Sequence, residues 1–265
     1  MRAAAGWRAR RGTRPSCSGS AWGHGWGECG RHVNSRALPP THTHSHPHGL
    51  YPAAAAWFHH TPAWRAAFPG LSPVTLAASA LFWAPLLRDV VMWAGARCVS
   101  RGALRRALVE ERRSVVLVPG GQAELVEHEG GNTTRLVTRH KGFLRHALEA
   151  RAAVCPIFVF GEAQEQRHLL RAKKMQRWTA KRLGFPFPFL PGGYLGVLPL
   201  PEPRPLTFCV GRPILPAGGD SRPPGAPVTD AEVDALHAAY YAQLVALFEQ
   251  HKVAAGFPDA KLIVD

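Results

Sequence analysis

The residues best suited to chemistry are two histidines in a proline–glycine turn, His46-Pro47-His48-Gly49. Neutral imidazole can accept a hydroxyl proton near physiological pH. The proline before His48 and the glycine after it fix the backbone and let other groups approach closely. We therefore predict His48 as a general base, with His46 as the second candidate.

A double glycine supplies the second candidate element. The β-branched run from Ser114 to Val118 predicts a buried strand, and Pro119-Gly120-Gly121 ends it in a turn. Successive backbone N–H groups at Gly120 and Gly121 can form a concave anion site, for a phosphate or for the oxyanion of a tetrahedral intermediate.

Two carboxylates follow predicted strands. Glu162 ends the strand predicted over residues 154–160, and Glu124 lies just past the double glycine. Strand ends in α/β sheets gather at one edge, where ligands bind, so either carboxylate could orient His48. A base, backbone donors and a carboxylate at one edge suit the transfer of an acyl group to a hydroxyl.

The formal net charge is +14, which favours anionic partners. Two groups of mainly basic residues stand out: Arg135, Arg139, His140, Lys141 and Arg145, then Arg167, Arg171, Lys173, Lys174, Arg177, Lys181 and Arg182. Trp178 and an aromatic run over residues 185–189 lie close to the second group. Basic residues beside aromatic ones suit an anionic membrane interface, or the phosphates of coenzyme A.

The chain is long enough, at 265 residues, to bury a full core. Its five cysteines show no CxxC spacing, which excludes a zinc signature or a disulfide framework. Residues 1–45 lack a sustained period, so we predict that this segment is disordered or comes from an incorrectly predicted first exon. We predict one domain over residues 46–265. Prolines and a glycine interrupt the uncharged stretch over residues 66–87, so we expect a helical hairpin rather than a membrane span.

Periodicity predicts alternating strands and helices, and hence an α/β layer architecture. Further strands are expected over residues 133–138 and 206–210, and Pro156 places the 154–160 strand near an edge or a bulge. Helices are expected over residues 101–113, 143–148 and 165–183. A last helix opens at Thr229 with a capping box completed by Glu232.

Two hypotheses that place the chain in other classes of protein stay open. His42, His44 and His46 would share one face of a strand and could bind zinc or nickel, which would make the chain a His-rich metal-binding protein. Alternatively, the chain could be a basic peripheral membrane or nucleic-acid-binding protein without catalysis.

Taken together, several motifs resemble the type 2 diacylglycerol acyltransferase family, which includes monoacylglycerol and wax-ester acyltransferases. They cover about His46 to Asp265 in matching order: HPHG, RDVVMWAGARCVSR, VPGGQAE, KGFLRHAL, PIFVFGE, GRPI and LFEQHK. The family also carries a hydrophobic strand before the histidine motif, and residues 1–45 show no such strand.

The resemblance implies a glycerolipid-acyltransferase-like mixed sheet flanked by helices. It also implies an acyl-CoA-dependent O-acyltransferase that forms triacylglycerol from diacylglycerol, with monoacylglycerol or a long-chain alcohol as the alternative acceptor. No cofactor, metal or nucleic acid is implied. The expected location is the endoplasmic reticulum membrane or a lipid droplet, with peripheral attachment to the membrane surface, and a homo-oligomer is left open.

The resemblance also assigns roles to residues. Plant-like members have Glu-Pro-His in the first motif, so the catalytic role falls on His48 rather than His46. Related acyltransferases with an H-x4-D motif place an aspartate where Ala53 stands here, so the carboxylate partner must come from elsewhere, Glu162 first and Glu124 second. The residues expected to bind acyl-CoA or a lipid headgroup are Arg139, Lys141, Gly142, Lys173 and Lys174.

Overall fold

The computed structural model describes residues 25–26, 41–46, 58–83, 87–128, 131–164, 167–187, 190–193, 195, 202, 204–216 and 227–265; for residues 25–26 and 41–46 it describes the backbone only. The strands are β1 (Gly25–Trp26), β2 (Thr41–His46), β3 (Val74–Ala77), β4 (Arg97–Cys98), β5 (Val115–Leu117), β6 (Thr133–Leu136), β7 (Ala153–Phe160), β8 (Arg167–His168), β9 (Pro191–Gly192), β10 (Thr207–Val210) and β11 (Lys261–Val264). The α-helices are α2 (Pro62–Ala67), α3 (Leu87–Trp93), α4 (Arg101–Arg105), α5 (Gly121–Glu127), α6 (Gly142–Glu149), α7 (Lys173–Leu183) and α8 (Asp230–His251). Single turns of other helix types are η2 (Phe58–His60), η3 (Ser79–Phe82), η4 (Arg106–Glu110) and η5 (Glu162–Gln164).

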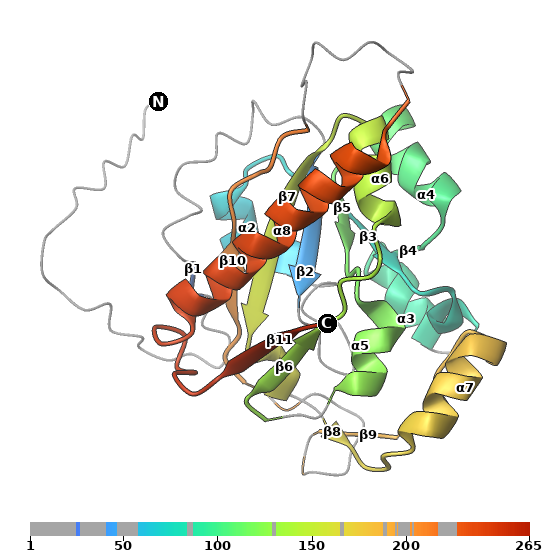
Figure 1. The fold of residues 1–265 in the computed structure, drawn as a ribbon, viewed down its shortest axis with the longest axis vertical. Coiled ribbons are helices and arrows are strands. Elements are labelled where there is room, and N and C mark those ends of the chain that lie inside the picture. The colour runs from blue at the N-terminus through green and yellow to red at the C-terminus, as the bar shows by residue number, and fades with distance from the viewer. Residues whose placement is uncertain are drawn as a thin grey trace, which may run out of the picture.

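A mixed sheet organises these elements, in the order β1-β10-β7-β2-β5-β3-β4. The strands from β7 to β4 pair in parallel, and β10 pairs with β7 in the antiparallel sense. Helices α8 and α6 cover the face turned to the viewer in Figure 1, and α2 lies behind the sheet. The predicted mixed α/β architecture is confirmed.

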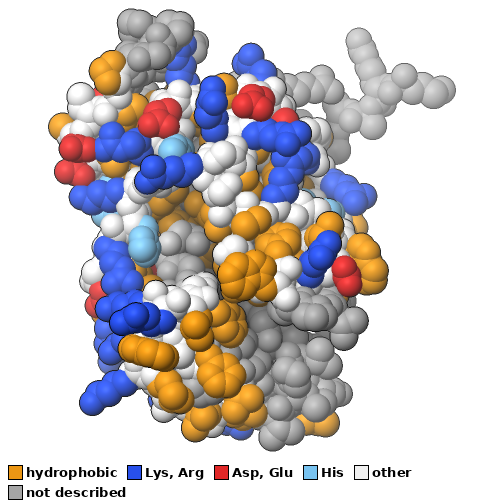
Figure 2. All heavy atoms as spheres, turned by 90° about the vertical axis from the view of Figure 1, so that its right-hand side faces the viewer, with side chains coloured by type: hydrophobic (Ala, Val, Ile, Leu, Met, Phe, Trp, Pro, Cys, Tyr) orange, Lys and Arg blue, Asp and Glu red, His pale blue; other side chains and the backbone are white. Residues whose placement is uncertain are grey.

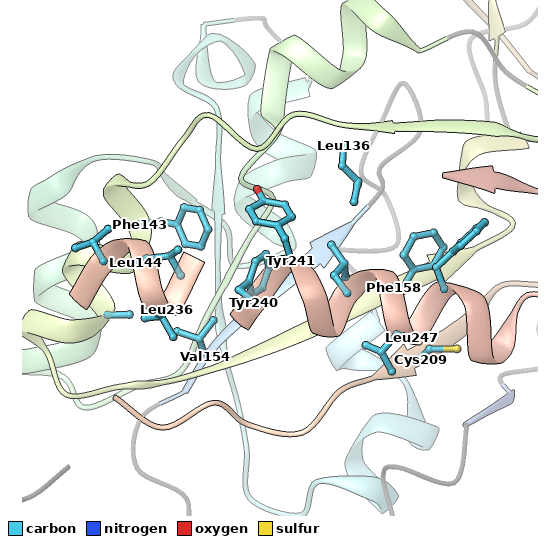
Figure 3. Packing of buried hydrophobic residues seen from close by; sticks show 14 of the residues in the cluster. Leu136, Phe143, Leu144, Val154, Phe158, Cys209, Leu236, Tyr240, Tyr241 and Leu247 are labelled. Atoms are coloured by element: carbon cyan, nitrogen blue, oxygen red, sulfur yellow. The ribbon is translucent and has the colours of Figure 1, made fainter. Parts of the chain in front are cut away.

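Strand β7 is buried along its whole length because both faces of the sheet are covered. Val154 and Phe158 face α8, whereas Ile157 and Val159 face the cluster around α2, as the strand period of two requires. Figure 3 shows the first cluster, in which side chains from α6 and α8 meet those of β7. This packing fixes the position and direction of the strand that ends before Glu162.

Strand β2 corrects the expected lack of a strand before the histidine motif. Thr41–His46 pairs in parallel with β5 on one side and β7 on the other. The sequence THTHSH does not show a hydrophobic strand, because a polar run between two strands carries no apolar period. The backbone pairing with β5 and β7 makes it a strand nonetheless, so the sheet includes residues that precede His46.

Pro156 shows how a central strand accepts a proline. The prediction of an edge position is wrong, since β7 lies between β10 and β2. The predicted bulge is present in the partner of β7. Ile157 pairs with Val210 and Val154 pairs with Ile214, so the partner segment has one more residue than β7 between these two pairs. Gly211 donates its N–H to the Pro156 carbonyl at 2.8 Å, and the missing proline N–H falls where the ladder is broken.

The predicted strands over residues 114–118, 133–138 and 206–210 and the capped last helix are confirmed as β5, β6, β10 and α8. The helical hairpin over residues 66–87 is wrong, because β3 joins the sheet there between β5 and β4. The helix predicted over residues 165–183 begins only at Lys173. Before it, Arg167 and His168 pair with β9, a contact distant in sequence that local periodicity cannot reveal.

A second, smaller sheet joins distant parts of the chain. Strand β11 pairs in parallel with β6, so residues 261–264 lie beside residues 133–136. The Arg135 guanidinium also forms an ion pair with Asp265 at 3.1 Å. Within the described ranges, none of the helices combines the length and the apolar character that a membrane crossing requires.

His59 provides a test of the packing on the α2 face. Burial, assisted by the charges of His60 and Arg113, lowers the pKa of this imidazole to about 4. As the pH falls from 6.5 to 4, the His59 imidazole binds a proton in the unfolded chain but stays largely neutral in the folded chain. The free energy of unfolding should therefore fall by roughly 3 kcal/mol through this window because of His59 alone.

Urea unfolding measured at pH 7 and pH 4.5 checks this expectation. The His59→Asn variant should lose less stability on acidification than the native chain does. An identical pH dependence in both proteins would show that His59 is not held neutral by the fold.

Candidate active site

Three neighbouring parallel strands end at one edge of the sheet. Strand β2 lies between β5 and β7, and these strands lead into the histidine motif, the double glycine and Glu162 respectively. In Figure 1 this edge lies below β2 and β7, where α5 begins. The strands that precede the three predicted segments therefore end at one edge, although the segments span more than a hundred residues of the chain.

The histidine motif begins at this edge. His46 is the last residue of β2, and its backbone lies opposite Phe158 of β7. Leu117, the last residue of β5, lies opposite His44. His48 lies outside the described residues, as does Gly49, so their predicted roles stay predictions.

The second residue of the double glycine has a positive φ, which glycine adopts at little cost. Gly120 has φ −68° and ψ −32°, and Gly121 follows with φ +49°. A right-handed residue followed by one of positive φ is the backbone pattern of an anion-binding nest. This conformation is compatible with the predicted role of the two N–H groups, which stays a prediction.

Glu124 lies directly against the double glycine. Its side chain is only 4% exposed, and its Oε1 accepts a hydrogen bond from the Val137 N–H at 3.0 Å. A Cβ on Gly120 would lie 1.8 Å from the Glu124 carboxyl carbon. Gly120 is therefore needed because a buried carboxylate occupies the space where a larger residue would place its side chain.

Glu162 is the most deeply buried charged residue at this edge, with 0% exposure. It follows Gly161, whose φ of +97° turns the chain as β7 ends. A Cβ at Gly161 would lie 2.5 Å from the Pro205 carbonyl oxygen. Neither Glu162 nor Glu124 is a surface residue, and burial of a carboxylate requires compensating polar contacts.

The two basic groups differ in their pairing. In the first group, Lys141 pairs with Asp234 at 2.7 Å and Arg145 pairs with Asp230, both on α8. Gly142 begins α6, and Arg139 is exposed with no ion pair to another described residue. The acidic residues of α8 and the C-terminal Asp265 thus neutralise much of the first group.

The second group lies on α7, next to α5. Lys173 and Arg177 both contact the Glu127 carboxylate of α5, whereas Lys174 is exposed and forms no ion pair to a described residue. Arg139 follows β6, and it is two residues from Val137, which donates a hydrogen bond to Glu124 of α5. The predicted anion-binding residues therefore flank α5 on two sides rather than form one patch.

Two histidines near α5 have roles that sequence reasoning missed. His168 is buried, and its Nε2 lies 2.8 Å from the Leu125 carbonyl oxygen, which anchors the helix that carries Glu124. Partial desolvation of the ring and the Arg139 charge lower the pKa of His140, against the opposing effect of Glu124. His140, predicted as part of a basic group, thus favours its neutral form. Because His140 stands between Arg139 and Lys141, the sequence indicated a basic residue and gave no sign that its imidazole favours the neutral form.

The side chains of β2 lie outside what the structure describes, so the proposed ligand set of His42, His44 and His46 stays untested. Elsewhere in the described part of the chain, no three metal-ligating side chains come together.

Comparison with known proteins identifies the family. The family model described as diacylglycerol acyltransferase matches residues 37–265. The chain belongs to the diacylglycerol acyltransferase family. It is similar to acyl-CoA wax alcohol acyltransferase 2 of Mus musculus, with 32% identity over 83% of this chain and 68% of that protein. It is also similar to 2-acylglycerol O-acyltransferase 3 of Homo sapiens, with 33% identity over 85% of this chain and 69% of that protein.

Among solved structures, the 1-acyl-sn-glycerophosphate acyltransferase PlsC of Thermotoga maritima matches 82% of this chain and 70% of its own. The TM-score of this match is 0.41 and the sequence identity is 14%. Membership of the diacylglycerol acyltransferase family makes this chain an acyl-CoA-dependent acyltransferase. The relatives' names cover several acceptors, so the acceptor does not follow from the family.

Gly161→Ala should destabilise the protein by about 2 kcal/mol or more, because alanine tolerates the positive φ poorly and its Cβ would clash with a backbone carbonyl. Urea unfolding measures the loss. Gly102→Ala in α4 is the matched control, because its nearest neighbour would be Ser100 Oγ at 3.9 Å. The control should leave stability unchanged or raise it by up to about 1 kcal/mol.

Gly120→Ala should displace the Glu124 carboxylate from the Val137 N–H and lower stability by roughly 1.5–3 kcal/mol. A double-mutant cycle isolates this cause. Once Glu124→Ala has removed the carboxylate, the Gly120→Ala change should cost little more. Additive losses would show that the two residues act independently.

Proposed function

We propose that the chain transfers a fatty acyl group from acyl-CoA to the free hydroxyl of diacylglycerol, which forms triacylglycerol. One observation carries the proposal: the parallel strands β5, β2 and β7 end side by side, and the double glycine, the histidine motif and Glu162 follow them directly. Acyl transfer needs a base, oxyanion donors and a carboxylate within reach of one thioester.

In the proposed mechanism His48 acts as the general base, with His46 as the alternative. The imidazole takes the proton of the acceptor hydroxyl while the oxygen attacks the thioester carbonyl carbon. The carbonyl oxygen becomes an oxyanion, which the N–H groups at Gly120 and Gly121 stabilise. When the intermediate collapses, the carbon–sulfur bond breaks and the coenzyme A sulfur receives the proton from the imidazolium.

A buried carboxylate supports the imidazolium in this proposal. Glu162 is the first choice, because it is fully buried where β7 ends, next to β2. Glu124 is the second, and its bond to Val137 holds it against the double glycine. A carboxylate in this environment strengthens the protonated form of a nearby histidine.

The anionic part of acyl-CoA is assigned to the cations that flank α5. Arg139 and Lys174 are the best candidates, since neither pairs with a described carboxylate, whereas Lys141 and Lys173 already have acidic partners. Gly142 begins α6 beside Lys141 and leaves room for a phosphate to approach.

Diacylglycerol is the proposed acceptor because the matching family model is described by that activity. The names of the two relatives point to long-chain alcohols and to 2-acylglycerol for those proteins. These alcohols are the alternative acceptors for this chain. A water-insoluble acceptor places the enzyme at a lipid surface, and we propose the endoplasmic reticulum membrane or a lipid droplet, with peripheral attachment.

His48→Ala should lower the acyl-transfer rate by roughly 10²- to 10⁴-fold, the usual contribution of a general base. The assay supplies labelled acyl-CoA with diacylglycerol, monoacylglycerol or a long-chain alcohol, which also ranks the acceptors. His146→Ala is the matched control, because this histidine pairs with Glu149 on α6. Equal rates for the native chain and the His48→Ala variant would reject the assigned base.

A further inference from the structure

Helix α7 carries its polar and apolar residues in the reverse of the usual arrangement. Its inward side chains are Gln176 and Thr179, both buried, whereas Trp178 is 59% exposed and Leu183 is 62% exposed. A surface helix of a globular protein normally turns its apolar stripe toward the core. The reversal leaves large apolar side chains facing outward.

Polar contacts on the inner side hold α7 in this orientation. The Thr179 hydroxyl accepts a hydrogen bond from the Phe187 N–H at 2.7 Å, which draws the following segment against the helix. The side chain of Phe187 is left 60% exposed. On α5, Glu127 pairs with Lys173 and Arg177, so the helix cannot turn its apolar side inward without breaking these bonds.

Three cations lie among the outward apolar residues. Lys174, Lys181 and Arg182 are exposed, and none pairs with a carboxylate in the part of the chain that the structure describes. The acidic residues of α8 pair with Lys141 and Arg145 of the other basic group, whereas these three cations of α7 have no such partner. Unpaired cations beside tryptophan and leucine match the boundary between headgroups and acyl chains.

The apolar exposure extends beyond α7. Figure 2 shows apolar side chains from the middle of this face to its lower end, with basic side chains at its margin. Exposed apolar side chains also follow or precede α7, and others lie on or near α3: Leu169, Leu170, Leu190, Leu195, Trp83, Val90, Met92 and Trp93. Apolar patches of this extent on a protein surface mark an interaction site.

We propose that the α7 surface, formed by Lys174, Met175, Trp178, Lys181, Arg182, Leu183 and Phe187, lies on a membrane that contains anionic phospholipids. This inference rests on the proposed function in one respect: the proposed lipid acceptor gives the enzyme a reason to bind a membrane through this surface. The cations contact headgroups, and Trp178, Leu183 and Phe187 enter the boundary of the acyl chains.

The location of α7 connects this surface with the candidate active site. Helix α7 packs on α5 through Glu127, and α5 begins at the double glycine and carries Glu124. Gln122 of α5 also donates a hydrogen bond to the Gly184 carbonyl at the end of α7. A membrane beneath α7 would therefore lie one helix away from the strand ends, where a lipid acceptor has to arrive.

Vesicle binding tests the proposal with the full chain. Flotation with phosphatidylcholine vesicles, with or without about a third phosphatidylserine, measures the affinity. Replacing Lys174, Lys181 and Arg182 with glutamate should weaken binding to the anionic vesicles by roughly 10²-fold, since each cation contributes about fivefold. The Trp178→Ala/Leu183→Ala variant should weaken binding to both kinds of vesicle.

Matched controls carry the same changes elsewhere. The charge control replaces Arg101, Arg105 and Lys261, which are exposed, with glutamate, and the apolar control is Leu215→Ala/Val253→Ala. Both should bind vesicles within a few fold of the native chain, and circular dichroism checks that every variant folds. Native-like binding by the α7 variants, or equal losses in the controls, would overturn the proposal.

Two further measurements separate the outcomes. If the charge-reversal variant loses affinity for a short DNA duplex while vesicle binding persists, α7 is a nucleic-acid surface and the proposal is wrong. His48→Ala should bind vesicles like the native chain, and the Trp178→Ala/Leu183→Ala variant should still acylate a short-chain diacylglycerol in detergent. Absence of acyl transfer together with vesicle binding that depends on α7 would reject the proposed function but leave this inference intact.

Discussion

The parallel pairing of β2 between β5 and β7 is the constraint on which the candidate site depends. Parallel strands present their carboxyl ends at the same edge, so three segments far apart in the sequence arrive together. The covered faces of the sheet hold β7 in place from both sides. Without β2 in this position, the histidine motif would have no defined relation to the double glycine or to Glu162.

A chain of backbone contacts links the C-terminus to this edge. Strand β11 pairs with β6, and the residue after β6, Val137, donates its N–H to Glu124. Glu124 lies on α5, which His168 and α7 hold from the other side. Because each contact positions the next, the carboxylate beside the double glycine depends on residues more than a hundred positions away.

Charge pairing divides the basic excess into two parts with different roles. The carboxylates of α8 and Asp265 bind cations near β6 and α6, so those residues largely tie the last helix to the fold. On α7, three cations stay exposed beside apolar side chains. The same residue types thus stabilise the fold in one region and leave a charged, apolar surface in the other.

The sequence by itself determined the elements whose signals are local. The β-branched run before Pro119 formed β5, the apolar run over residues 154–160 formed β7, and Thr229 with Glu232 capped α8. The glycine-rich turns also indicated where strands would end. Family membership followed from the motifs, because their order and spacing are specific.

Only the tertiary structure decided what depends on distant partners. The polar run Thr41–His46 became a central strand through its pairing with β5 and β7, and Pro156 was accommodated because its neighbour bulges. Because β8 pairs with β9, α7 begins only at Lys173. Hydrogen bonds on the inner side of α7 leave its apolar side chains facing outward. Local periodicity records which residues are apolar, but the contacts between segments decide which side faces the core.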